Sequence, residues 1–341
     1  MNREQNLLLG IAAGTAGTLA GRWLMRQRRA MDFAGRNVVI TGGSRGLGLV
    51  LARQLAGEGA RICLLARDEG ELARARAQLA LEGAVDTLAM RCDIRRRADV
   101  QATIDKLLET WAGVDVLINN AGVIQVGPLE HMKHEDFENA MATHFWGPLH
   151  LIQACVPSMR RRGFGRIVNI SSIGGRVAVP HLAPYSASKF ALAGLSDAIR
   201  AELSQYGIRV TTVYPGLMRT GSPRNAMMKG KHEAEYAWFA ISDALPGLSI
   251  SAERAAHQIL EACRYGDPEL VITLQARMAI VANVLAPAAF AATMMMAARM
   301  LPGPNGTEGD RSKKGYESES RWAPSVATTL SDRAAVVNNE V

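Results

Sequence analysis

The sequence has few of the residues that build disulfide frameworks or zinc sites. Only four cysteines occur in 341 residues, and no Cys-x-x-Cys or paired Cys/His spacing appears among them. Structural disulfides belong to oxidising compartments, and zinc sites need closely spaced thiolate or imidazole ligands. We therefore expect reduced, buried thiols in a chain that faces the cytosol, and no metal site.

Aromatic residues are also scarce, at 5% of the chain, and none is interleaved with the clustered arginines at 95–97 and 160–162. The net charge of +7 therefore has no recognisable nucleic-acid-binding module beside it, and we expect no nucleic-acid partner. The arginine clusters suit a membrane surface or an anionic cofactor instead. A hydrophobic content of 48% with 21% charged residues is typical of a folded core and excludes global disorder.

Two stretches lack charged residues altogether, and the first is 5–21. It contains two small-xxx-small glycine spacings and is followed by an arginine-rich flank. Such a stretch is near the lower length limit for a membrane span, and positive charges after it keep the downstream chain cytoplasmic. We predict an N-terminal membrane anchor with its basic flank at 1–30 and a catalytic domain facing the cytoplasm. A helix packed on the domain or a disordered leader is the alternative, and would make the chain cytoplasmic.

The second uncharged stretch, 278–298, is interrupted by Pro287. Because proline breaks a helix, we expect an apolar extension at 276–302 made of two short helices rather than one span. These helices could lie in a membrane interface, cover an apolar pocket or form the surface of a soluble dimer. Residues 303–341 are rich in Gly, Ser, Asn and mixed charge, and we predict a mostly disordered tail there.

Between these ends, residues 35–275 alternate apolar strands with helical segments. The expected strands are 37–41, 61–67, 86–93, 114–120, 165–172, 208–216 and 269–274. Near-continuous apolar strands separated by helices are typical of a parallel sheet covered on both faces. We predict one α/β domain, a Rossmann-type doubly wound parallel sheet with helices on both faces, that binds its ligand at the carboxyl ends of the strands.

The segment TGGSRGLG at 41–48 connects the first strand to the first helix. Gly42 permits a tight turn, Gly46 lets the backbone approach a pyrophosphate, and Gly48 allows close packing of helix on strand. The second strand ends in Arg67, where an NAD site carries an acidic residue, and Arg45 lies inside the loop. Two guanidiniums without a carboxylate favour a 2′-phosphate, so we predict NADP(H) as cofactor.

Tyr185 and Lys189 in YSASK are four residues apart on an expected helix, so both side chains reach a common point. A nearby ammonium favours the phenolate and lowers the pKa of a tyrosine. Alone, the pair is also compatible with an ordinary helix surface.

Further motifs follow in a recognisable order. They are Asp93 after the third strand, NNAG at 119–122, NISS at 169–172, YSASK at 185–189 and YPG at 214–216. With TGGSRGLG before them, residues 35–275 resemble the short-chain dehydrogenase/reductase family. The resemblance implies that Tyr185 is the general acid in ketone reduction and the general base in alcohol oxidation. It implies that Lys189 lowers the tyrosine pKa and holds the nicotinamide ribose, and that Ser172 hydrogen-bonds the substrate oxygen.

The resemblance also extends the cofactor site, with Asp93 and Ile94 at the adenine and Asn119 as a brace between strands. The expected cofactor contacts are Gly42, Ser44, Arg45, Gly46, Leu47, Gly48, Arg67, Asp93, Ile94, Asn120, Ala121, Gly122, Tyr185, Lys189, Pro215, Gly216 and Thr220. One position departs from the family: His144 stands where members usually carry an asparagine that positions a proton-relaying water. Imidazole can donate, accept and hold a water, so we expect His144 to act as a fourth catalytic residue. A histidine satisfied by neighbouring helix backbone is the alternative.

The loop at 217–250 is, by the same resemblance, the segment that closes over the substrate. Its apolar lining is offered by Met218, Met227, Met228, Tyr236, Trp238 and Phe239. This lining predicts a lipophilic ketone or alcohol as substrate, although packing of the loop on its own domain is the alternative. Lys229, Lys231 and His232 could instead receive an acidic head group.

The leading hypothesis is a membrane-associated, NADP(H)-dependent reductase of a lipophilic carbonyl, acting in lipid metabolism. The alternatives are a non-catalytic NADP(H)-binding scaffold and a soluble reductase of small polar ketones. The resemblance further implies a homodimer or homotetramer that pairs through the helices at 135–161 and 184–206.

Overall fold

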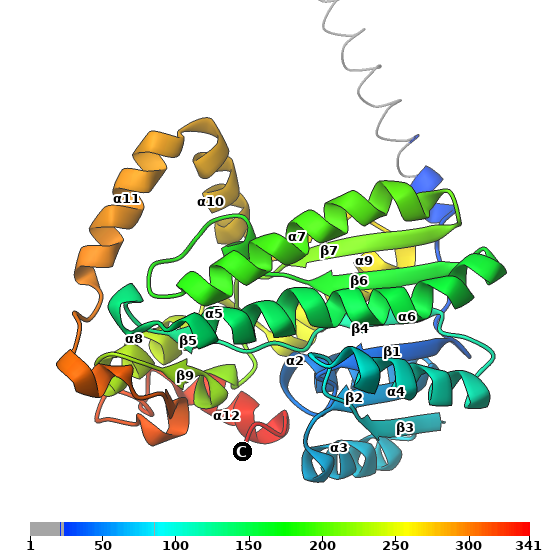
Figure 1. The fold of residues 1–341 in the computed structure, drawn as a ribbon, viewed down its shortest axis with the longest axis horizontal. Coiled ribbons are helices and arrows are strands. Elements are labelled where there is room, and N and C mark those ends of the chain that lie inside the picture. Colours follow the sequence, from blue (N-terminus) through cyan, green and yellow to red (C-terminus); the bar gives the residue numbers. More distant parts are fainter. Residues whose placement is uncertain (1–20, 22–23, 85) are drawn as a thin grey trace, which may run out of the picture.

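The core of the chain is one parallel sheet of seven strands (Figure 1). The computed structural model describes residues 21, 24–84 and 86–341. In sheet order the strands are β11 (Glu269–Val271), β7 (Ile208–Tyr214), β6 (Gly165–Ile170), β4 (Val116–Asn119), β1 (Asn37–Thr41), β2 (Arg61–Ala66) and β3 (Asp86–Arg91), all parallel. The strand order reverses between β1 and β4, which is where a doubly wound sheet binds its ligand. The predicted fold class is confirmed.

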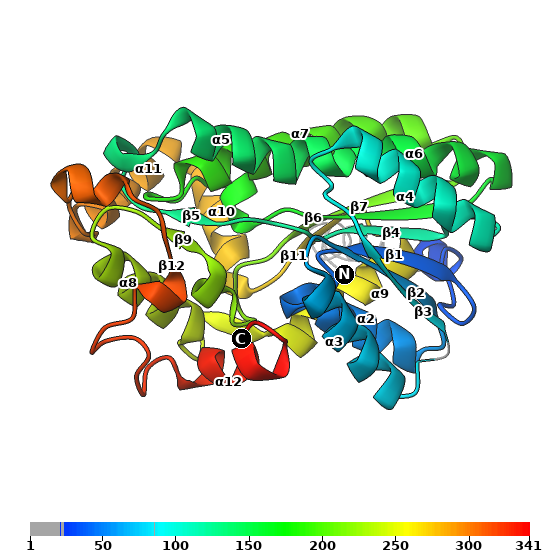
Figure 2. The same ribbon diagram turned by 60° about the horizontal axis from the view of Figure 1, so that its bottom comes forward.

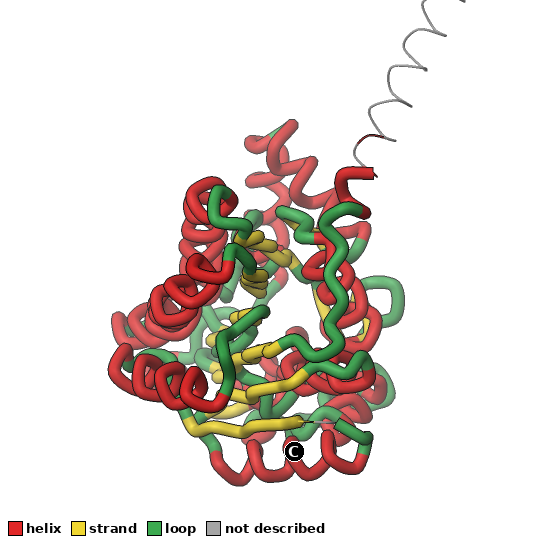
Figure 3. Tube along the Cα trace, turned by 90° about the vertical axis from the view of Figure 1, so that its right-hand side faces the viewer, coloured by secondary structure: helices red, strands yellow, loops and turns green. Residues whose placement is uncertain are grey.

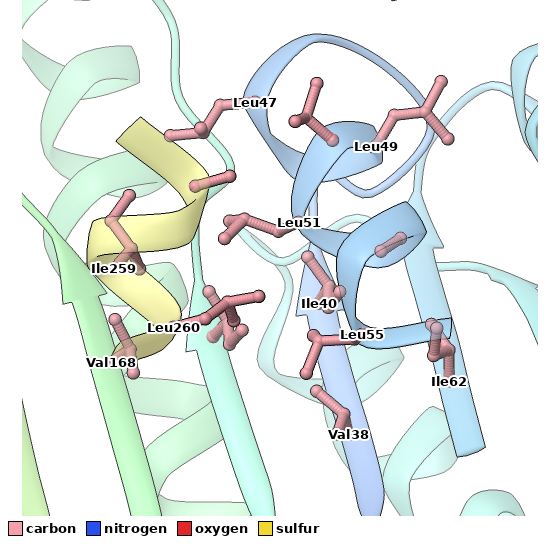
Figure 4. Packing of buried hydrophobic residues seen from close by; sticks show 14 of the residues in the cluster. Val38, Ile40, Leu47, Leu49, Leu51, Leu55, Ile62, Val168, Ile259 and Leu260 are labelled. Carbon is pink, nitrogen blue, oxygen red and sulfur yellow. The ribbon is translucent and has the colours of Figure 1, made fainter. Parts of the chain in front are cut away.

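Helices cover both faces of this sheet (Figures 2 and 3). On one face lie α2 (Gly46–Gly57), α3 (Glu69–Leu81) and α9 (Ala252–Tyr265), and on the other α4 (Arg97–Thr110), α6 (Gly147–Arg162) and α7 (Ala183–Ser204). Figure 4 shows leucines of α2 packed over Val38 and Ile40 of β1, and Ile259 and Leu260 of α9 packed beside Val168 of β6. All four cysteines are free and buried, as expected.

A smaller lobe is built at the carboxyl ends of the strands by segments that follow β4 and β7. It contains β5 (Gln125–Val126), α5 (His134–Met141), β8 (Leu217–Arg219), β9 (Met227–Met228), α8 (His232–Ala244) and β10 (Ser249–Ser251). Its buried apolar cluster is formed by Val126, Leu182, Ala226, Met228, Tyr236, Ala237, Phe239, Ala240 and Ala323, and we call it the lobe cluster. A π-helical turn, Ala142–Trp146, joins α5 to α6.

The apolar extension forms a hairpin of two helices that projects away from the sheet (Figure 1). They are α10 (Leu274–Leu285) and α11 (Pro287–Met300), with Pro287 as the first residue of α11, so the prediction of two short helices is confirmed. No residue of α11 is buried. Within the described part of the chain, no helix is long and apolar enough to cross a membrane. The predicted anchor at 5–21 lies outside the described residues, apart from Gly21.

The prediction of a disordered tail at 303–341 is wrong. The tail contains β12 (Lys313–Lys314), which pairs antiparallel with β9, and α12 (Thr329–Val337). It folds on small side chains rather than large apolar ones: Ala323 belongs to the lobe cluster and Ala335 is 1% exposed. The final residues then lie beside α2 and α3 (Figure 2).

Candidate active site

The glycine-rich loop has the backbone geometry that its sequence predicts. Gly42 and Gly46 have φ of +61° and +54°, which residues with a Cβ adopt only under strain. A Cβ on Gly48 would lie 2.1 Å from the Gly42 carbonyl oxygen, so only glycine lets α2 pack this closely. The N–H of Gly46 at the start of α2 donates to the Asn338 carbonyl at 2.8 Å. An acceptor already binds at this helix N-terminus, and a pyrophosphate has the same chemistry.

The charged residues around this loop are paired with one another. Ser44 Oγ donates to Glu71 Oε2 at 2.8 Å, and Arg45 lies within 3.4 Å of Glu71 and 3.6 Å of Glu340. Arg67 is exposed just after β2. Arg45 thus already faces carboxylates, as it would face a phosphate, and the part of Arg67 in cofactor binding stays a prediction.

The expected adenine end is ordered by a local ion pair. Asp93 binds Arg95 through both carboxylate oxygens, which holds the pKa of Asp93 below its usual value. The carbonyl of Ile94 accepts a hydrogen bond from the ring of His150 at 3.2 Å. The adenine-binding role that the resemblance implies for Asp93 therefore competes with Arg95.

The floor of the site is fixed by the end of β4. Asn120 and Ala121 both donate their N–H groups to Thr41 Oγ1, and Asn120 Nδ2 bonds the Thr41 and Gly42 carbonyls. The Asn119 amide instead bonds Asn169 on β6 at 2.8 Å, as expected for a brace between strands.

Ser172, Tyr185 and Lys189 come together where β6 ends and α7 begins. Ser172 accepts a hydrogen bond from the Gly174 N–H at 3.0 Å. Its hydroxyl and the ring of Tyr185, in the first turn of α7, meet over Gly174, where an added Cβ would lie 3.4 Å from Ser172 Oγ and 3.3 Å from Tyr185 Cε1. Lys189 follows one turn later, with Nζ 5.6 Å from the centroid of the Tyr185 ring. Ser171 is directed elsewhere, because its hydroxyl donates to the Lys189 carbonyl.

Burial controls the pKa values of this group. It raises the pKa of Tyr185, and the hydrogen bond with Ser172 only partly opposes it. It also lowers the pKa of Lys189 to about 7, and Nζ donates to the Ile170 carbonyl at 2.8 Å. A lysine that is half neutral near pH 7 stabilises a phenolate only weakly, and the role of Lys189 in lowering the tyrosine pKa stays a prediction.

His144 is fully buried within the π-helical turn, and both of its ring nitrogens bond protein groups. Nε2 accepts from the Val123 N–H at 3.1 Å, so Nδ1 carries the proton and donates to Ser188 Oγ at 2.7 Å. Burial, and to a lesser extent Lys189, holds the pKa of the imidazole well below its usual value. The structure therefore favours the satisfied histidine over a proton relay through a water held by this ring.

The predicted nicotinamide end lies beside these residues. The Pro215 carbonyl accepts from the Ile173 N–H at 2.8 Å, which joins the loop after β7 to the Ser172 turn. Gly216 packs against Thr273, and the Thr220 carbonyl accepts from Asn338 Nδ2 at 3.5 Å.

Comparison with known proteins agrees with this geometry. The family model described as short chain dehydrogenase matches residues 36–229. The chain belongs to this family. Dehydrogenase/reductase SDR family member 7B of Danio rerio is 32% identical to it over 311 residues, which cover 89% of this chain and 99% of that relative.

Two solved relatives share the fold of this short-chain dehydrogenase. A metagenomic short-chain oxidoreductase in complex with NADP has a TM-score of 0.58 and 28% identity, and the match covers 71% of this chain and 97% of that one. L-Sorbose reductase from Gluconobacter frateurii, complexed with NADPH and L-sorbose, has a TM-score of 0.63 and 26% identity over the same shares.

The segment 217–250, predicted to close over the substrate, is more internally packed than its sequence suggests. Tyr236, Phe239 and Met228 are buried in the lobe cluster, and Met218 packs against the sheet core. The two residues proposed to meet an acidic head group, Lys229 and His232, are also engaged internally. Lys229 pairs with Asp136, and the His232 ring N–H donates to the Arg311 carbonyl at 2.6 Å. Lys231 is exposed.

Sequence reasoning missed the residues that the tail brings to this site. Asn338 and Glu340 lie on the glycine-rich loop, and Ser331 of α12 bonds the buried carboxyl of Asp243 at 3.4 Å. Burial raises the pKa of Asp243 to about 7. No motif marks these residues, because the contacts join segments far apart in the chain.

Proposed function

We propose that this short-chain dehydrogenase is an NADP(H)-dependent oxidoreductase that reduces a ketone, or oxidises a secondary alcohol, on a lipophilic substrate. The observation that carries the proposal is the meeting of Ser172, Tyr185 and Lys189 at the end of β6, on the sheet edge that also holds the glycine-rich loop. A phenol, a hydroxyl and an amine at one point provide the acid, the orienting donor and the proton reserve for carbonyl reduction.

In reduction, the Tyr185 hydroxyl donates its proton to the carbonyl oxygen of the substrate. Ser172 orients that oxygen: its own oxygen accepts from the Gly174 N–H, which leaves its hydroxyl hydrogen to donate. The reduced nicotinamide supplies the hydride when it is bound. Because the pKa of Lys189 is about 7, this amine can return a proton to the tyrosinate near neutral pH. Oxidation runs the same proton transfers in reverse.

The choice of NADP(H) is supported by Arg45 and Arg67. Arg45 lies inside the loop that would hold the adenosine phosphates, and Arg67 directly follows β2, where an NAD site carries an acidic residue. Two solved relatives hold NADP or NADPH. A guanidinium binds a 2′-phosphate with charge-assisted hydrogen bonds that a ribose hydroxyl cannot match.

The preference for a lipophilic substrate is supported by the surroundings of Tyr185. Its ring packs against the lobe cluster, together with Val179 and Trp238. An apolar wall beside the proton donor favours an apolar group on the carbonyl carbon. The L-sorbose bound to one solved relative keeps a small polar ketone as the second candidate.

The decisive experiment is NADPH and NADH oxidation by wild type and Tyr185→Phe with ketones graded from polar to apolar. We expect turnover to require NADPH, to rise with apolarity, and to fall about 10²–10⁴-fold in Tyr185→Phe. Highest turnover with small sugars or keto acids would favour the polar-ketone candidate. Cofactor binding without turnover of any ketone would favour the non-catalytic scaffold.

Membrane association is a separate part of the proposal. The hairpin of α10 and α11 supports it, since Met278, Val284, Leu285, Met295 and Met296 are all more than half exposed. Helices that expose several large apolar side chains together with a few polar ones suit a lipid interface. Detergent-free fractionation of wild type and a Val284→Lys/Met295→Lys variant tests this: wild type recovered wholly in the supernatant would refute it.

Pairing of two or more copies through α6 and α7 is likewise a proposal. A groove between these helices is lined by Ile152, Val156, Ile199, Leu203 and Tyr206. Light scattering coupled to size exclusion measures the outcome, and a monomeric mass for both wild type and Ile199→Lys would contradict pairing.

A further inference from the structure

The C-terminal segment, residues 338–341, lies on the glycine-rich loop. The Gly46 N–H at the start of α2 donates to the Asn338 carbonyl at 2.8 Å. The Asn339 side-chain amide donates to the Ser44 carbonyl at 2.9 Å, across 295 positions of sequence. Figure 2 shows the C-terminus beside α2 and α3. The segment therefore contacts the loop through its backbone and its side chains.

Glu340 brings a carboxylate to the same place. Its side chain is 6% exposed, and a Cβ added to Gly46 would lie 2.5 Å from its Oε1. Arg45 Nε is 3.6 Å from the carboxylate, and Asn225 Nδ2 donates to it at 2.7 Å. Burial raises the pKa of this carboxyl, while Arg45 and Asn225 oppose the shift. A carboxyl group is thus fitted against the helix N-terminus, beside a guanidinium.

We propose that the C-terminal segment is a built-in competitor of the cofactor, which occupies the pyrophosphate position and has to leave before NADP(H) binds. This inference rests on the proposed function, because it requires the glycine-rich loop to be the cofactor site. The loop then has two mutually exclusive occupants, the C-terminal segment of its own chain and the dinucleotide.

Exclusion follows from occupancy and from charge. The single N–H of Gly46 is already bonded to the Asn338 carbonyl. A pyrophosphate at this amide would also meet the Glu340 side chain, whose Oε1 lies directly over Gly46, and the ionised form of this carboxyl would repel it. A segment that only covered a bound cofactor would leave the Gly46 amide free.

The helix α12 holds the segment in place from outside the loop. Its Ala335 packs on Gly221, where an added Cβ would lie 2.4 Å from the Ala335 Cα. Arg53 on α2 donates to the Val337 carbonyl at 2.6 Å. Because Ala335 is buried outside the loop, a bulky residue there displaces the segment without changing any residue that would touch the cofactor.

The test compares NADPH dissociation constants, measured by calorimetry, for wild type, Ala335→Arg, Glu340→Gln and Glu308→Gln. The apparent dissociation constant equals the constant of the open chain divided by the fraction of molecules whose loop is free of the segment. If the segment is docked in about nine of ten molecules, NADPH binds about tenfold more weakly than it would to a chain whose segment is always released. We expect Ala335→Arg to bind NADPH about tenfold more tightly than wild type, and Glu340→Gln about threefold. Glu308→Gln removes an exposed carboxylate of the same tail and should leave the constant unchanged.

Hydrogen exchange of the wild-type protein supplies a second readout that needs no variant. NADPH should speed exchange in the peptide 329–341, because α12 and the segment are released. Any of three results would overturn the proposal. They are slower exchange in this peptide with NADPH, weaker NADPH binding by both Ala335→Arg and Glu340→Gln, and equal NADPH dissociation constants for all four proteins. If NADPH binds to none of the four, the proposed function itself fails, and this proposal falls with it. Should Ala335→Arg not fold, Glu340→Gln and the exchange experiment still decide.

Discussion

Replacement of His144 by alanine should chiefly cost stability. The change removes the acceptor of the Val123 N–H and the donor to Ser188 Oγ. An unpaired, partly buried N–H costs about 1–3 kcal/mol, and the lost bond to Ser188 costs about 1 kcal/mol more. Ser188 keeps its own bond to the Tyr185 carbonyl, so its hydroxyl is not orphaned. The free energy of unfolding should therefore fall by about 2–4 kcal/mol.

The pH dependence of this loss has a definite sign. The pKa of His144 is held well below its usual value in the folded chain, so the unfolded chain binds the extra proton below about pH 6.5. Acid therefore destabilises wild type through this group and does not destabilise His144→Ala through it. The difference in unfolding free energy should be constant from about pH 7 upward and shrink as the pH falls below about 6.5.

Urea unfolding at several pH values, with turnover under folding conditions, measures both effects. His144→Asn is the matched control, because a carboxamide also offers one acceptor and a donor group and should recover part of the stability. Turnover of the folded His144→Ala enzyme should fall less than that of Tyr185→Phe. An unchanged unfolding free energy combined with a turnover loss as large as that of Tyr185→Phe would refute this reasoning and restore the proton relay.

Three further predictions concern the cofactor loop and the lysine. Arg67→Asp should weaken NADPH binding about 10-fold to 100-fold and NADH binding much less, because Arg67 is exposed and its loss disturbs no packing; equal weakening of both cofactors would count against the 2′-phosphate role. Lys189→Met should abolish turnover yet stabilise the fold at pH 8, on the order of 2 kcal/mol. At this pH the unfolded chain still holds the lysine proton, whereas the folded chain, with a lysine pKa of about 7, has largely lost it. Denaturant titration at pH 8 and pH 10 should show this gain in unfolding free energy shrinking as the pH rises. Gly48→Ala places a Cβ 2.1 Å from a backbone oxygen and should lower the melting temperature markedly, as calorimetry would show; an unchanged melting temperature would contradict the close packing of α2.

The sequence predicts the fold well, and it also predicts which three side chains meet at the end of β6, because both depend on local patterns. Strand positions follow from uninterrupted apolar runs, and the break between α10 and α11 follows from Pro287. The positions of Ser172, Tyr185 and Lys189 follow from motifs at the ends of such elements. The structure brings these three together because parallel strands end at one edge of the sheet.

The pKa values of the buried groups and the folded structure of the tail could not be predicted from such local patterns. The pKa of Lys189 depends on how completely distant segments bury it, whereas the i,i+4 spacing reports only its distance from Tyr185. The same reason applies to Lys229, whose partner Asp136 lies on another element. The tail has little apolar periodicity, so its composition predicts disorder, yet its order comes from hydrogen bonds to remote backbone.

The N-terminus of α2 explains why a polar tail docks at this point of the protein. The first N–H groups of α2 and the guanidinium of Arg45 need acceptors, and burying them without partners costs free energy. In the cofactor-bound enzyme a pyrophosphate would meet that need, and in the free chain Asn338 and Glu340 meet it. On our proposal, the features that let the loop bind an anion are also those that hold the tail. Substitutions in the loop that tighten NADP(H) binding should therefore also tighten the docking of the tail, so the two effects offset each other. Substitutions in the tail change only its docking, and these should tune the cofactor affinity of this enzyme.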